Sequence, residues 1–129
     1  MKTAATITVS ERDFQQLMTL IESIDTPASA ALDEELSRAD VVPTRKLPAD
    51  IVAMGSKVSF RDRDSGEETT VTLVYPREAN VDRMCISVLS PVGSALIGLR
   101  TGGTIDWPLP GGKFRRLEVT AVEQAEDPS

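Results

Sequence analysis

The sequence contains no histidine and a single cysteine, Cys85. The absence of histidine excludes serine–histidine and cysteine–histidine nucleophilic sites, together with most zinc sites. One cysteine excludes a disulfide within the chain, and the apolar run 84–89 around Cys85 predicts a buried small hydrophobic side chain. We therefore expect a protein without catalytic residues, without a metal site and without a cofactor.

Long apolar runs and an excess of positive charge are also missing. No apolar stretch approaches the roughly 20 residues that are needed to span a bilayer. The apolar part of the N-terminal segment is too short for a signal peptide, so we expect a cytoplasmic protein that does not contact a membrane. The net charge of −6 argues against direct, sequence-specific or simple backbone binding to nucleic acid. A basic surface on a partner protein fits this charge better.

The first third of the chain has the pattern of two helices. Ser10 to Asp13 is typical of a helix N-cap, with aspartate in place of the usual glutamate. The apolar residues that follow are spaced by three, four and three positions, which predicts a heptad-like helix from about Glu11 to Ile24; they are Phe14, Leu17, Ile21 and Ile24.

A second helix is predicted to begin directly afterwards, with Thr26 as its cap and Pro27 as its first residue. Its apolar stripe runs from Ala28 to Ala39, and Glu34 and Arg38 are expected to pair. Each helix would have about 15 residues, and the tip of the hairpin would reach roughly 22 Å from the body. Residues 42–50 contain two prolines and read as a linker, so we expect a helical hairpin over 1–46 and a second domain over 47–129.

The second domain has the alternating pattern of strands. Residues 56–61 and 67–75 predict a hairpin with a turn at Asp64–Gly66, and 84–89, 104–109 and 114–122 predict three further strands. Between them, Ser90 and Pro91 have the pattern of a helix start, and glycine ends the helix a few residues later. The expected fold is α+β: an N-terminal antiparallel helical hairpin, or short coiled coil, and an antiparallel sheet with one short helix.

Several short motifs occur in the same order as in the Gre transcription-factor superfamily, and the chain resembles that superfamily well over residues 50–122. Over residues 1–45 the resemblance is mainly architectural, with a further match in 32–39. The matching segments are Met54–Ser56, Ser65–Glu67, Thr72–Pro76, Ser90–Gly93, Ala95–Gly98 and Pro110–Gly112. The resemblance implies an N-terminal coiled coil and an FKBP-like C-terminal domain.

The resemblance also implies a partner, bacterial RNA polymerase, bound at the rim of its secondary channel. The docking role of the Ser-Pro segment carries over to Ser90 and Pro91, and less directly to Val92. The implied function is that of a transcription regulator that competes with Gre-type factors and affects nucleoside diphosphate kinase levels.

Two alternative functions remain at this point. Gre factors have a much longer coiled coil, and an acidic pair at its tip helps to hold a catalytic magnesium ion. Here the tip offers Asp25, with Glu22 three positions earlier, so a cleavage-stimulating factor is the alternative to a non-enzymatic regulator. The FKBP-like fold raises prolyl isomerase activity, although the chain has few aromatic residues to line such a pocket.

Three further groups of residues are candidates for binding sites. The acidic residues around the 62–68 turn are better explained by a solvated turn than by a cation site. Lys113, Arg115 and Arg116 are better explained by a solvated strand face than by a nucleic-acid contact. Trp107 is expected in the core or in a pocket.

Overall fold

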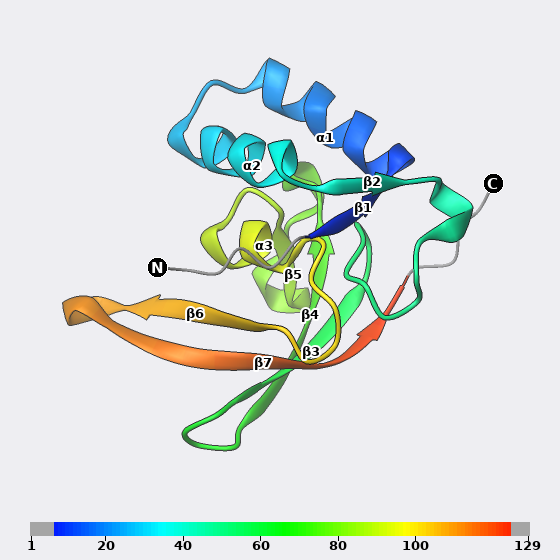
Figure 1. The fold of residues 1–129 in the computed structure, drawn as a ribbon. Coiled ribbons are helices and arrows are strands. Elements are labelled where there is room, and N and C mark those ends of the chain that lie inside the picture. The colour runs from blue at the N-terminus through cyan, green and yellow to red at the C-terminus, as the bar shows by residue number, and fades with distance from the viewer. Residues whose placement is uncertain (1–6, 125–129) are drawn as a thin grey trace.

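The computed structural model describes residues 7–124, apart from the side chains of Val81, Pro91 and residues 107–110. A pair of helices lies across one side of a curled sheet, and the short helix α3 lies between this pair and the sheet (Figure 1). The helices are α1 (Glu11–Ser23), α2 (Pro27–Ser37) and α3 (Pro91–Leu96). The strands are β1 (Thr8–Ser10), β2 (Asp40–Val42), β3 (Lys57–Asp62), β4 (Glu68–Val74), β5 (Cys85–Ser87), β6 (Thr104–Leu109) and β7 (Lys113–Glu123).

Both predicted caps are present in the helical hairpin. Ser10 Oγ accepts the N–H of Asp13 at 3.1 Å, which satisfies one of the free donors at the start of α1. Thr26 and Ser29 form a reciprocal capping box at the start of α2, where Pro27 is the first residue. The predicted Glu34–Arg38 pair was wrong, because Arg38 contacts Glu35 instead, at 3.2 Å.

The chain enters and leaves the hairpin through two short parallel strands. β1 pairs with β2 in the register Thr8↔Asp40, Val9↔Val41 and Ser10↔Val42. The Thr8 N–H also donates to the carbonyl of Gly98 at 3.3 Å, so this small sheet is joined to the segment after α3. The prediction that the linker begins at Val42 was therefore wrong, because that residue completes a strand.

The main sheet has the order β5-β4-β3-β7-β6. The predicted β3–β4 hairpin is confirmed, and every pair in this sheet is antiparallel except β4–β5. β5 was predicted to be buried, yet its three side chains, including that of Cys85, are only half-buried because β5 forms one edge of the sheet. The expected α+β fold, a helical hairpin followed by a sheet, is confirmed.

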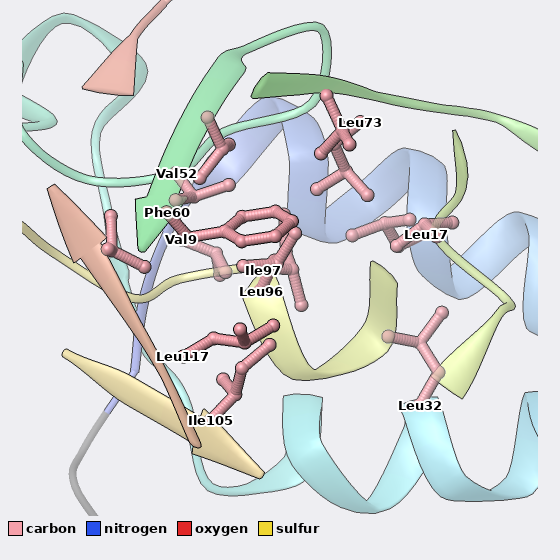
Figure 2. Packing of buried hydrophobic residues seen from close by; sticks show 14 of the residues in the cluster. Val9, Leu17, Leu32, Val52, Phe60, Leu73, Leu96, Ile97, Ile105 and Leu117 are labelled. Atoms are coloured by element: carbon pink, nitrogen blue, oxygen red, sulfur yellow. The ribbon is translucent and has the colours of Figure 1, made fainter. Parts of the chain in front are cut away.

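The hairpin and the sheet share one apolar core. Leu17 and Leu32 are 0% exposed and Leu36 is 1% exposed, and they belong to the same cluster as Phe60 of β3. Figure 2 shows Phe60 between Val52 and the residues of α3, with Leu17 and Leu32 closing one side of the cluster. The hairpin therefore lies against the body. The expectation that its tip extends the full length of its helices away from the body was wrong.

Two predictions from the sequence remain untested. The side chain of Trp107 lies outside the described residues, so its predicted burial stays a prediction. The boundary between residues 46 and 47 also stays a proposal, because the core is continuous across it. Within residues 7–124, no helix combines the length and the apolar character that crossing a membrane requires.

Candidate functional site

The corner between β5 and α3 carries the residues that the sequence assigned to partner binding. The Ser90 O–H and N–H both donate to the carbonyl of Ser87, at 2.7 and 2.9 Å. Ser90 Oγ in turn accepts the N–H of Gly93 at 3.0 Å, which caps α3. The Ser90 hydroxyl is thus engaged as donor and acceptor within the chain, and its role is to fix the shape of the corner.

Gly93 is required by this shape. A Cβ atom at position 93 would lie 2.0 Å from the carbonyl oxygen of Ser87, which no side chain tolerates without movement of the backbone. The first turn of α3 therefore packs directly on the end of β5. A rigid turn of this kind presents the same surface to a partner in every copy of the molecule, which lowers the ordering cost of binding.

Of the three predicted docking residues, the structure describes two side chains. Ser90 and Val92 are half-buried, and Val92 packs against the core cluster. The side chain of Pro91 lies outside the described residues, although its backbone begins α3. Part of the Val92 side chain is therefore used to pack α3 on the core, so Ser90 and Pro91 remain the stronger docking candidates.

The predicted tip residue, Asp25, lies in the turn between α1 and α2 and is exposed. Its neighbours hold the turn in place: Ser29 Oγ donates to the carbonyl of Ile24 at 2.7 Å, and the Thr26 N–H donates to Ser29 Oγ at 3.0 Å. Glu22 is also exposed, on the last turn of α1. The tip is therefore an ordered turn with one carboxylate of its own.

A buried aspartate that the sequence analysis treated only as a capping residue joins the hairpin to the sheet domain. Asp13 is 7% exposed, and its Oδ2 accepts the N–H of Met54 at 3.0 Å. Burial raises the pKa of this carboxyl, although the Met54 bond and the nearby Arg12 oppose that shift. No local pattern predicts this contact, because the two residues are far apart in the sequence.

Tyr75 forms a second polar contact across the same junction. Its O–H donates to Gln16 Oε1 at 2.8 Å, so the end of β4 is tied to α1. Burial, followed by the negative charges of Asp13 and Glu78, raises the pKa of Tyr75, so the phenol stays protonated and remains a donor. Tyr75 lay in a matching motif, but the sequence did not indicate this role.

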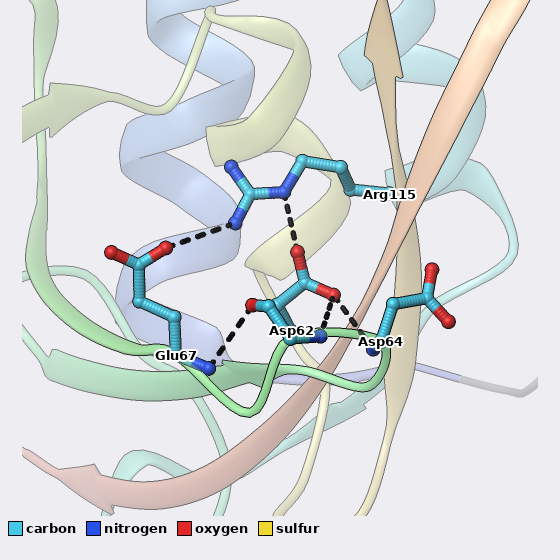
Figure 3. A network of polar contacts seen from close by, with 5 residues as sticks. Asp62, Asp64, Glu67 and Arg115 are labelled. Atoms are coloured by element: carbon cyan, nitrogen blue, oxygen red, sulfur yellow. Dashed lines mark hydrogen bonds and ion pairs between the residues drawn. The ribbon is translucent and has the colours of Figure 1, made fainter.

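The acidic turn at 62–68 binds an arginine of its own chain. Asp62 Oδ1 accepts the N–H of Asp64 at 2.8 Å, and its Oδ2 accepts Arg115 Nε at 2.6 Å (Figure 3). Arg115 also lies 3.7 Å from Glu67, and Arg116 Nε donates to Asp106 at 3.2 Å. The bond from the Asp64 N–H, followed by the bond from Arg115, lowers the pKa of Asp62. The turn is thus a closed network that joins β3–β4 to β7.

No group of three histidine, cysteine or acidic side chains is placed to hold a metal ion among the residues described here. The arrangement therefore offers a capped corner, an ordered acidic tip and a polar junction between hairpin and sheet. These features can present a surface to a partner.

Comparisons with known proteins agree on the family. Residues 47–124 match the family described as "Transcription elongation factor, GreA/GreB, C-term", and residues 6–42 match the "Rnk N-terminus" family. The regulator of nucleoside diphosphate kinase from Escherichia coli K12 is 40% identical over 121 residues, which cover 92% of this chain and 89% of that protein.

Two elongation factors are also similar, one over part of its length and one over nearly all of it. GreA from Rhodospirillum rubrum is 46% identical over 92 residues, which are 70% of this chain and 57% of that protein. The solved structure of a transcription elongation factor GreA/GreB from Nitrosomonas europaea matches with a TM-score of 0.81 at 41% identity, covering 92% of this chain and 98% of that chain. The chain belongs to the GreA/GreB transcription elongation factor family through its residues 47–124, and its residues 6–42 belong to the separate Rnk N-terminus family.

Proposed function

We propose that this chain is a non-enzymatic regulator that binds RNA polymerase at the secondary channel. The corner formed by Ser90, Pro91 and Val92 docks on the channel rim, and the chain thereby competes with Gre-type factors for one site. An influence on nucleoside diphosphate kinase levels is part of the proposal, because the relative from Escherichia coli carries that name.

The observation that carries the proposal is the short hairpin packed on the body. α1 has 13 residues and α2 has 11, which correspond to lengths of about 20 and 17 Å. Their buried leucines bind the hairpin to the sheet domain, and the turn between them lies on the same side of the molecule as α3 (Figure 1). A factor docked through the corner keeps this tip close to its own body.

The chemistry of the tip supports the same function. Metal-assisted hydrolysis needs carboxylates delivered close to an ion and an oriented nucleophile. The turn offers Asp25, while Glu22 lies on the preceding helical turn. A single carboxylate in the turn of a short hairpin does not reproduce a positioned acidic pair, which disfavours the alternative of a cleavage-stimulating factor.

Stalled elongation complexes test the proposal directly. The chain alone should leave the rate of transcript cleavage unchanged, and it should slow cleavage when it is added to GreA, because occupation of a shared rim excludes the second factor. Asp25→Asn should inhibit GreA as the wild type does. Cleavage by the chain alone that disappears in Asp25→Asn would establish the alternative function.

The docking corner is tested by Pro91→Asp, which places a charge where the partner is expected to pack. Affinity for core RNA polymerase should fall at least about tenfold, since a desolvated, unpaired charge strongly opposes association. Ser65→Asp is the matched control, because it adds the same charge at the exposed β3–β4 turn. Equal affinities of Pro91→Asp and the control, with both variants folded, would remove the corner from the interface.

A further inference from the structure

A groove of about 730 Å³ lies between α1 and the segment that follows β4. One wall is formed by the second half of α1 and the other by the residues after Val74. The first wall includes Thr19, Leu20 and Ile24, and the second is formed by Tyr75, Pro76 and Arg77. Both walls contribute apolar surface, and Thr19 is exposed along the groove.

The groove and the docking corner both follow the C-terminal ends of strands β4 and β5. These strands are parallel, with Val74 opposite Ser87, so they end on the same side of the sheet. Tyr75 follows the first strand directly, and Ser90 comes three residues after the end of the second. The N–H of Val88 donates to the carbonyl of Val74 at 2.9 Å, which fixes the two segments side by side. The groove and the corner therefore follow the ends of neighbouring strands.

The walls of the groove are held in place. The bond between the Tyr75 hydroxyl and Gln16 joins them, and Leu20 packs against the core cluster. A groove with fixed walls is already shaped for a ligand, so binding requires little ordering of the protein.

The charge around the groove indicates the kind of partner. Residues 11–40 contain eight acidic and two basic residues and so carry a net charge of −6, whereas residues 41–124 contain ten acidic and eleven basic residues. Glu22 and Asp25 are exposed and flank the groove residues Ser23 and Ile24. On the other wall, Arg77 is the charged residue among those that line the groove, and the exposed Glu78 follows it. Three carboxylates, those of Glu22, Asp25 and Glu78, thus adjoin lining residues that include one cation.

We propose that this groove binds a basic amphipathic helix of RNA polymerase, next to the element on which the Ser90–Val92 corner docks. The inference rests on the proposed function and names the partner element for that site. The groove follows α1 from Gln15 to Ile24, a distance of roughly 14 Å or between two and three helical turns. Apolar side chains of the partner helix fill the groove, and its lysine and arginine residues face the three carboxylates beside the groove.

Two matched variants on the same hairpin test the groove. Thr19→Arg fills it with a long cationic side chain at an exposed helical position, where arginine is a better helix former than threonine. Ala31→Arg adds the same charge at an exposed position of α2 that does not line the groove. Affinity for core RNA polymerase should fall at least about tenfold in Thr19→Arg and by less than about threefold in Ala31→Arg.

The outcomes separate this inference from the function on which it rests. If the wild type does not bind core polymerase, the proposed function fails and the inference fails with it. If the wild type binds and both arginine variants bind equally well or equally weakly, the groove is not part of the interface and the proposed function stands. Thermal unfolding of the three proteins shows whether each variant is folded.

A separate variant tests the proposed attraction between the acidic residues near the groove and a basic partner helix. Glu22→Gln removes one exposed charge next to the groove while it keeps the size of the side chain. The association rate should fall about two- to threefold at low salt, and the difference should vanish as ionic strength rises. A salt-independent effect, or none at low salt, would contradict the basic character of the partner helix.

Discussion

Asp13 and Asp62 are buried aspartates that join different parts of the molecule, and their surroundings shift the pKa of the carboxyl group in opposite directions. Asp13 is 7% exposed at the junction of hairpin and sheet, where burial dominates and raises the pKa of its carboxyl. Asp62 is 5% exposed at the junction of the β3–β4 turn and β7, where bonds from Asp64 and Arg115 dominate and lower the pKa of its carboxyl.

The difference shows what holds each junction together. The β3–β4 turn is held by the ion pair between Asp62 and Arg115 and by backbone N–H donors, and both favour the charged form of Asp62. The hairpin is held by leucines with 0–1% exposure, and burial disfavours the charged form of its aspartate. The hairpin junction should therefore be sensitive to lost apolar contacts, and the two junctions should respond in opposite ways to pH.

The largest effect is expected from removal of the hairpin. A fragment of residues 47–129 loses Val9, Leu17, Leu32 and Leu36 from its core. We propose that it still folds, with a free energy of unfolding at least about 3 kcal/mol below that of the full chain, because each buried apolar side chain contributes about 1.5–3 kcal/mol. Residues 1–46 alone should not fold. Denaturant unfolding measures both, and equal stability of fragment and full chain would show that the hairpin packs weakly.

A single leucine should produce the next largest effect. Leu32→Ala removes a side chain with 0% exposure from the hairpin junction, and we expect it to cost about 2–5 kcal/mol in the free energy of unfolding. Asp33→Ala is the control on the same helix at an exposed position, where the expected change is within about 0.5 kcal/mol. Similar losses for the two variants would contradict the apolar character of the junction.

The smallest effect is the pH dependence, and its sign distinguishes the two aspartates. Folded Asp13 holds its proton more tightly than unfolded Asp13 does. Its contribution to stability is thus present at low pH and is lost as pH rises from about 4 through its raised folded pKa. The contribution of Asp62 is present above about 4 and is lost as pH falls through its lowered folded pKa.

Unfolding titrations of Asp13→Asn and Asp62→Asn between pH 7 and pH 3 check this prediction. The stability of the wild type relative to Asp13→Asn should increase toward low pH, and its stability relative to Asp62→Asn should decrease. Parallel profiles for the two variants would show that the local surroundings do not determine the two pKa shifts.

Much of the fold could be predicted because it is specified by neighbouring residues. Ser10, Thr26 and Ser90 cap their helices as the sequence indicated, and alternation located β3 and β4. The parallel pairing of β1 with β2 and the half-exposed position of β5 could not be predicted. Both depend on which distant segments meet, and periodicity does not report that.

The same limit applies to the candidate site. The corner at Ser90 has a local pattern, so the sequence located it. The groove has walls from α1 and from the residues after β4, and only the packing of the hairpin on the sheet brings them together. The short distance between Asp13 and Met54 likewise follows from that packing.

The position of β7 has a consequence for how the chain is made. β7 lies between β3 and β6 and pairs with both, and the register Lys57↔Glu123 joins the first strand of the main sheet to the last. During synthesis, β3 and β4 leave the ribosome well before the strand that completes their sheet. Until then β3 has one unpaired edge, and Val58 and Phe60 lack their cross-strand partners Val122 and Val119. The nascent chain is therefore most prone to misassociation in the interval before β7 emerges.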